Sequence, residues 1–173
     1  MAKKVFKNRI IYLFIILFVA TALIIWASST PTLYEKYAIS RVMPVPVSAE
    51  SQPNIVQAAN LFNTGDYLKA KRILQPEYME HPQNPFLSYY FAITLIETGK
   101  AYEARTILMP LNKKQSLFTD DAAYYIALSF LKHNQWSFFE KVNKPEAIEW
   151  LKKVPAGTPN ASKAQALIAE LEQ

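Results

Sequence analysis

The sequence contains no cysteine and only two histidines among its 173 residues. The absence of cysteine excludes disulfide bonds, thiol catalysis and thiolate metal sites together. The two histidines, His81 and His133, are 52 positions apart and show no nucleophile–base or metal-ligand spacing. We interpret the adjacent carboxylates Asp120 and Asp121 as helix capping rather than an acid–base pair. We therefore expect no catalytic, metal or cofactor site and a protein that is not an enzyme.

The net charge of +5 is concentrated near the N-terminus. Four of the nineteen basic residues, Lys3, Lys4, Lys7 and Arg9, precede an apolar run. The rest of the chain carries fifteen basic against fourteen acidic residues, so it has no strong basic excess. Nucleic-acid binding requires a basic stripe or patch. We therefore do not expect a nucleic-acid partner, and nothing in the sequence indicates a small-molecule substrate.

The apolar run from Ile10 to Ala27 contains eighteen residues without a charge. At about 1.5 Å per residue, it nearly covers a hydrocarbon core of about 30 Å. We predict a transmembrane helix at 10–28, with the basic flank 1–9 in the cytoplasm and the rest of the chain outside. A cleavable signal peptide is the alternative, because Ala27-Ser28-Ser29 provides small residues. The apolar run is, however, longer than the usual signal-peptide core of about 7–15 residues.

Residues 29–52 form a predicted linker, which contains three prolines and little helical period. Within the linker, Leu33-Tyr34-Glu35-Lys36-Tyr37 is more aromatic than a plain spacer. We favour a short anchor at the membrane interface for this stretch and its continuation through Arg41 and Pro44. Folding back onto the first helices of the following domain is the alternative.

A segment of the chain recurs after 34 residues. Residues 63–76 and 97–110 align without a gap and share Thr, Gly, Ala, Ile, Leu and Pro at equivalent positions. A fixed period of this size is typical of stacked helical hairpins. Gly65 and Gly99 would end the first helix of each hairpin in a left-handed residue. Each hairpin has an apolar face that it cannot bury alone, so neighbouring hairpins must stack.

This pattern resembles the tetratricopeptide repeat (TPR). Gly65-Asp66-Tyr67, Ala70 and Pro82 match the family motif at the family's spacing, and Gly99 and Ala104 repeat part of it. The resemblance covers roughly residues 54–172. It implies an all-α fold in which TPR-like hairpins stack as an α-solenoid.

The chain also departs from the family pattern. The usual early Trp is absent, Ser116 stands where the second closing Pro would be, and Pro76 and Pro110 interrupt the second helices. Because an internal Pro costs about 3 kcal/mol, we expect each second helix to end or kink near its proline.

The TPR-like domain is predicted to span residues 53–173. A third hairpin would open with a cap at Thr119-Asp120-Asp121 and contain an insertion at 137–144, and Asn160 would cap the last helix. Three hairpins and a terminal helix meet the usual minimum for an independently stable array. The predicted repeats are 53–84, 85–118 and 119–159, followed by a C-terminal capping helix at 160–172.

The combination is similar to membrane-anchored TPR proteins of bacterial, Bacteroidetes-like envelopes, through the aromatic stretch 33–37 and through residues 123–132. This similarity implies a scaffold in the bacterial inner membrane whose periplasmic domain binds another envelope protein or a peptide segment. An ancillary factor in protein secretion or membrane-complex assembly is the alternative. An envelope enzyme is a more distant one.

The family's groove positions place the expected protein-binding residues on the concave face of the array. The family's carboxylate clamp needs Lys and Asn where this chain has Ile55 and Ala59, so we exclude acidic chaperone C-termini as ligands. An extended or helical segment with apolar anchors fits better. Packing of several of these residues against the linker or the capping helix is the alternative. The predicted binding residues are Phe62, Asn63, Tyr89, Ile93, Ile96, Glu97, Tyr124, Leu128, Leu131 and Lys132.

Overall fold

The computed structural model describes residues 12, 14–22, 31–38, 41–45, 52–114, 116–132 and 142–173. Every regular element within these ranges is an α-helix, which confirms the predicted all-α class. The chain forms two compact units, Met1–Lys36 and Tyr37–Gln173, and each is treated separately below.

In the first unit, residues 14–22 are helical and their large apolar side chains are exposed. The predicted transmembrane segment, 10–28, extends beyond the described residues at both ends, and the basic flank 1–9 lies outside them entirely. Within the described residues, no helix has both the length and the apolar character that crossing a bilayer requires.

A short helix that the sequence did not predict, α2 (Leu33–Tyr37), lies inside the predicted linker. A reciprocal capping box starts this helix. The Thr32 amide donates to Glu35 Oε2 at 2.8 Å, and the Glu35 amide donates to Thr32 Oγ1 at 3.2 Å. The Thr-x-x-Glu spacing was therefore a helix signal that the aromatic composition concealed.

The second unit contains two helical hairpins that begin and end close to the predicted residues. The first comprises α3 (Pro53–Asn63) and α4 (Tyr67–Glu80), and the second comprises α5 (Pro85–Glu97) and α6 (Ala101–Asn112). Helices α3 and α5 begin with proline, because an amide hydrogen at the first helical position would make no hydrogen bond within the helix.

Left-handed glycines produce the turn inside each hairpin, as predicted. Gly65 has φ of 80° and Gly99 has φ of 78°. Next to Gly65, the Asp66 amide donates to the Leu61 carbonyl at 2.8 Å, and Lys100 makes the equivalent bond to Leu95 at 2.8 Å. These bonds satisfy carbonyls that the helix end would otherwise leave without a partner.

We expected each second helix to end or kink near its proline, and α4 does not end there, because it continues past Pro76 to Glu80. The second proline, Pro110, also lies inside its helix, which ends at Asn112. Both prolines and the residues four positions earlier, Arg72 and Thr106, are exposed. Water can therefore bond the carbonyls that lose their intrahelical partner, which lowers the cost of an internal proline.

The C-terminal part consists of α7 (Thr119–Leu131), α8 (Lys144–Leu151) and α9 (Ala161–Leu171). Thr119 begins α7 as predicted, but Phe118 occupies the cap position and makes no side-chain cap bond. Asn160 occupies the cap position of α9 without capping it. Most of the predicted insertion, 137–144, lies outside the described residues.

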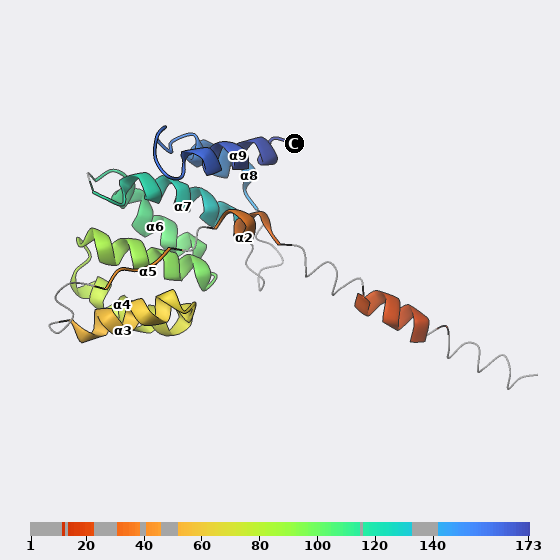
Figure 1. Ribbon diagram of the computed structural model, residues 1–173, viewed down its shortest axis with the longest axis horizontal. Coiled ribbons are helices and arrows are strands. Elements are labelled where there is room, and N and C mark those ends of the chain that lie inside the picture. Colours follow the sequence, from red (N-terminus) through yellow and green to blue (C-terminus); the bar gives the residue numbers. More distant parts are fainter. Residues whose placement is uncertain are drawn as a thin grey trace, which may run out of the picture. The chain divides into compact units, whose positions relative to one another are not determined.

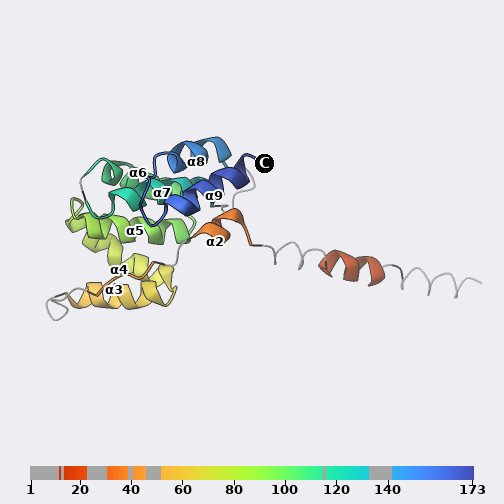
Figure 2. The same ribbon diagram turned by 45° about the horizontal axis from the view of Figure 1, so that its top comes forward.

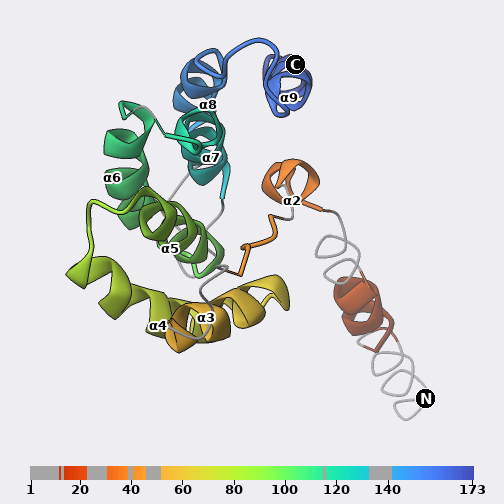
Figure 3. The ribbon, with the colours of Figure 1, turned by 60° about the vertical axis from the view of Figure 1, so that its left-hand side comes forward.

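Within the second unit, the helices from α3 to α9 pack in sequence order, and α5 also contacts α7 (Figures 1, 2 and 3). This one-dimensional stacking is compatible with an α-solenoid. The helices can approach closely because the recurring alanines are completely buried. These alanines are Ala58, Ala70, Ala92, Ala104, Ala127 and Ala147.

Candidate functional site

Most of the predicted binding residues belong to the core of the second unit. Seven apolar or aromatic members of the set are no more than 3% exposed, so in this conformation they are not available as anchors for a partner. They are Phe62, Tyr89, Ile93, Ile96, Tyr124, Leu128 and Leu131.

The three polar members of the set lie in two places. Lys132 Nζ and Glu97 Oε2 form an ion pair at 3.0 Å between α7 and α5, with side chains 21% and 20% exposed. Asn63, at the end of α3, instead binds a separate stretch of the chain. The predicted residues therefore do not form one exposed patch.

Asn63 holds the backbone of Met43, which belongs to a non-helical segment that we call the strap (residues 41–45). The Met43 amide donates to Asn63 Oδ1 at 2.7 Å, and Asn63 Nδ2 donates to the Met43 carbonyl at 3.0 Å. The Asn63 carboxamide therefore bonds both the backbone amide and the backbone carbonyl of Met43, a residue that lies outside the helices. Part of the predicted linker therefore returns to the first hairpin.

The residues before Met43 bind the next helices of the array. The Tyr90 hydroxyl of α5 donates to the Val42 carbonyl at 3.2 Å, and Arg41 Nη2 donates to Asp121 Oδ1 of α7 at 2.7 Å. Three successive strap residues are therefore bonded to α3, α5 and α7 (Figures 1 and 3). The bonds from Asn63 and Tyr90 use strap backbone, whereas the bond from Arg41 uses a charge.

The contact continues to the C-terminal end of the array through Tyr37, the first residue of the second unit. The Tyr124 hydroxyl donates to the Tyr37 carbonyl at 2.9 Å, and the Tyr37 hydroxyl donates to Glu170 Oε2 of α9 at 2.8 Å. Tyr37 and the strap therefore contact α9, α7, α5 and α3 in the reverse of chain order.

Asp121 is the polar centre of this surface. Its Oδ1 accepts from Arg41 Nη2 at 2.7 Å and from Asn160 Nδ2 at 2.6 Å, and its Oδ2 accepts from the Tyr89 hydroxyl at 3.2 Å. Asp121 lies in the first turn of α7 and Asn160 at the cap position of α9, but neither helix has a side-chain cap bond. The side chains of Asp121 and Asn160 join α7 to α9 and to the strap, and Asp120 remains exposed.

Burial sets the proton affinities around Asp121. The pKa values of Tyr89 and Tyr125 lie above the usual range, chiefly because burial disfavours the phenolate. Burial alone would lower the pKa of Arg41, but Tyr89, Asp121 and Tyr125 raise it overall. Arg41 is therefore a permanent cation, and no proton-transfer role follows from this cluster.

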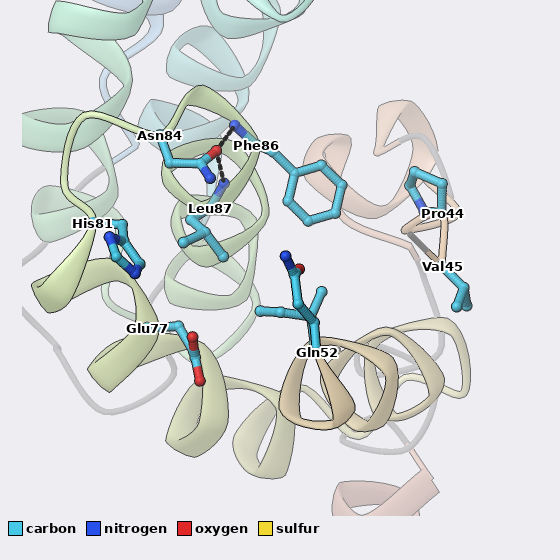
Figure 4. A pocket seen from close by; sticks show the side chains of 9 residues that line it. Pro44, Val45, Gln52, Glu77, His81, Asn84, Phe86 and Leu87 are labelled. Carbon is cyan, nitrogen blue, oxygen red and sulfur yellow. Dashed lines mark hydrogen bonds between the residues drawn. The ribbon is translucent and has the colours of Figure 1, made fainter. Parts of the chain in front are cut away.

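A pocket of about 430 Å³ lies where the strap approaches the first hairpin and the start of α5 (Figure 4). Its polar groups are partly engaged already: Glu77 accepts from Asn54 at 2.8 Å, and Asn84 caps α5 by accepting from the amides of Phe86 and Leu87. The lining residues are Pro44, Val45, Gln52, Ile55, Glu77, His81, Asn84, Phe86 and Leu87.

In the described part of the chain, no three His, Asp or Glu side chains are placed to hold a metal ion together. Comparisons with family models, with curated proteins and with solved structures found no match to this chain.

Proposed function

We propose that this protein is a single-pass, membrane-anchored TPR-like scaffold whose helical array docks a segment of another envelope protein. One observation carries the proposal: α3, α5 and α7 hold a non-helical stretch of polypeptide by its backbone and by one cation. Side chains that satisfy successive backbone amides and carbonyls suit a stretched polypeptide ligand. Stacked helical hairpins provide such surfaces along their length.

The proposed anchor rests on the sequence. An uncharged run of eighteen residues follows four basic residues, which favours a retained helix with a cytoplasmic N-terminus and a periplasmic array. Intact-mass measurement of the membrane-bound protein is expected to give the full-length chain. A mature protein that starts near Thr30 would show that the run is a cleaved signal peptide instead.

Affinity capture tests the docking role. The full chain, tagged at its C-terminus, is solubilised from membranes after mild crosslinking, and the recovered proteins are identified by mass spectrometry. The matched control is a chain that ends after Gln52, because it keeps the anchor region and the linker but lacks the array. We expect one envelope protein to be recovered with the full chain and lost with the control.

Two results would contradict the proposal. Recovery of the same proteins by both chains would show that the array docks nothing, and turnover in a broad hydrolase screen would favour an envelope enzyme. Recovery of several subunits of a secretion or assembly complex would instead identify the scaffold as an ancillary factor in that process.

A further inference from the structure

We infer that the strap is an intramolecular ligand of the array, and that the partner displaces it with a stretched segment of the same chemistry. That chemistry is a basic residue, then an outward-facing residue, then a flexible apolar residue. The inference rests on the function proposed above and names the kind of partner segment that the array accepts.

Side-chain burial along the strap alternates as a stretched ligand requires. Met43 is 0% exposed, Val42 is 71% exposed, and Arg41 reaches inward to Asp121. The bonds to Met43 and to the Val42 carbonyl use backbone atoms, so any stretched segment could make them. Selectivity therefore comes from the two inward positions, a cation opposite Asp121 and an unbranched apolar side chain in the Met43 position.

The strap does not use every hydrogen bond and apolar contact that is available at this surface. Among the described residues, Arg41 Nε is the one buried side-chain nitrogen or oxygen that lacks a hydrogen-bond partner. Such an atom weakens binding because it has lost water without gaining an acceptor. The strap's C-terminal residues, Pro44 and Val45, are exposed at the edge of the 430 Å³ pocket.

A partner segment could therefore compete in two ways. The basic residue of the partner could make hydrogen bonds with all of its donor groups. The partner could also place a further apolar side chain against Ile55, Phe86 and Leu87 in the pocket. The strap has the compensating advantage of being tethered, because an intramolecular ligand acts at a high effective concentration. An acidic segment is excluded, since it would place a carboxylate against Asp121.

A binding experiment in trans tests the inference. The probe is a fluorescent peptide with the sequence of residues 37–46, and the protein is the full chain in detergent. The opened variant, Arg41→Gln with Met43→Ala, weakens the tethered ligand and is expected to bind the peptide about tenfold or more tightly than the wild type. Val42→Ala is the matched control, because it changes an outward-facing strap residue, and it should bind like the wild type.

A third variant assigns the site. Addition of Asp121→Asn to the opened chain should abolish the gain, because the peptide's arginine loses its partner. If the opened chain is folded by circular dichroism but binds the peptide no better than the wild type, the strap is a fixed part of the core and the inference fails. Retention of the gain with Asp121→Asn would also overturn it, because the peptide would then bind elsewhere.

Amide exchange in the wild type provides a measurement that needs no variant. The Met43 amide is bonded to Asn63 and should exchange through local opening, much faster than the Ile96 amide inside α5. Equal exchange of both amides through global unfolding would overturn the inference, even if the opened variant failed to fold.

The failure of this inference can be distinguished from failure of the proposed function. If the wild type and the opened chain capture the same partner equally well, the scaffold role stands and the partner docks away from the strap. If the opened chain binds the peptide but neither chain captures a protein, the strap is still a displaceable ligand and the scaffold role fails.

Discussion

Single residues set the geometry of each hairpin through backbone conformation rather than through contacts. Gly65, at φ of 80°, turns the chain between α3 and α4, and a Cβ added there would meet no atom within 4 Å. The cost of another residue at this position is therefore conformational, since L-residues are disfavoured in the left-handed region by about 1–2 kcal/mol.

Gly65→Ala is accordingly expected to lower the free energy of unfolding by about 1 kcal/mol, because the reduced freedom of the unfolded chain offsets part of the strain. Gly65→Asn should cost less, since asparagine tolerates the left-handed region. Chemical denaturation of the two variants checks this order. Equal stability of Gly65→Ala and the wild type would mean that the turn relaxes out of the left-handed conformation.

Buried tyrosines make the fold sensitive to alkali. Burial raises the pKa of Tyr124 from 10.0 to about 12, with Tyr37 adding to the effect and Arg41 opposing it. The unfolded chain therefore releases this proton near pH 10, whereas the folded chain holds it until about pH 12. The stabilisation is complete below pH 10 and is lost as the pH rises toward 12, by about 2–3 kcal/mol.

Tyr124→Phe removes this ionisation, so its alkaline unfolding midpoint should lie above that of the wild type. At neutral pH the same variant should be about 1 kcal/mol less stable, because the bond to the Tyr37 carbonyl is lost. Circular dichroism across pH, with phenolate absorbance, measures both effects. Tyr102→Phe, at a residue that is 70% exposed, controls for loss of one phenol. An unchanged midpoint in Tyr124→Phe would assign alkaline unfolding to other groups.

The roles of polar residues were the least predictable part of the site. Asp121 and Asn160 have residue types and local positions that suit helix caps, and the sequence gives no other local signal. Their observed partners are distant in the chain: Arg41 is 80 positions from Asp121, and Asn160 is 39 positions from it. Only the stacking of helices brings these groups together, so spacing along one element could not predict the cluster.

At the scale of elements, the sequence predicted the helices well where prolines, glycines and alanines affect only the residues next to them in the chain. The starts of α3 and α5 and both glycine turns followed from such residues. The extent of α4 did not, because the cost of Pro76 depends on whether solvent reaches the freed carbonyl, which tertiary structure decides. The α2 helix was missed because its five residues are too few to show a helical period.

The close packing of the middle hairpin should make it intolerant of added volume. Ala92 of α5 is 0% exposed, and Ala92→Leu is expected to destabilise the fold by about 1–3 kcal/mol through overpacking. Ala166→Leu is the matched control, because Ala166 is an exposed helical alanine in α9. Thermal unfolding of both variants provides the measurement. An unchanged melting temperature for Ala92→Leu would contradict the helix contacts described for α5.

At the scale of the whole second unit, the repeat predicted a stack of hairpins but not the strap that is bonded to α3, α5 and α7. The predicted binding residues lie on or directly after α3, α5 and α7, but their apolar side chains are core residues in this chain. The strap is short, lacks a helical period and contains a proline, as a linker does. The position of the strap depends on Asn63, Tyr90 and Asp121 together, and no single sequence pattern indicates that combination.

The strap should also make the stack unfold more cooperatively, because it ties the terminal hairpin to the rest. In a linear array each hairpin is otherwise stabilised mainly by its neighbours. The first hairpin is held through α4 against α5, through the ring contact of Phe62 with Tyr90 at 5.3 Å, and through the two bonds from Asn63 to Met43. Loss of the Asn63 bonds should therefore loosen this hairpin before the others.

Asn63→Ala is expected to lower the opening free energy of the first hairpin by about 1–2 kcal/mol, which is roughly 5–30-fold faster amide exchange in α3. Exchange in α7 should change much less, because α7 keeps its neighbours on both sides. Asn54→Ala is the matched control, since Asn54 lies on α3 but binds Glu77 within the same hairpin and not the strap. It should leave α3 exchange near the wild-type rate. If Asn63→Ala accelerates amide exchange in α3 and α7 by the same factor, the unit opens as a whole, and the strap does not determine which hairpin opens first.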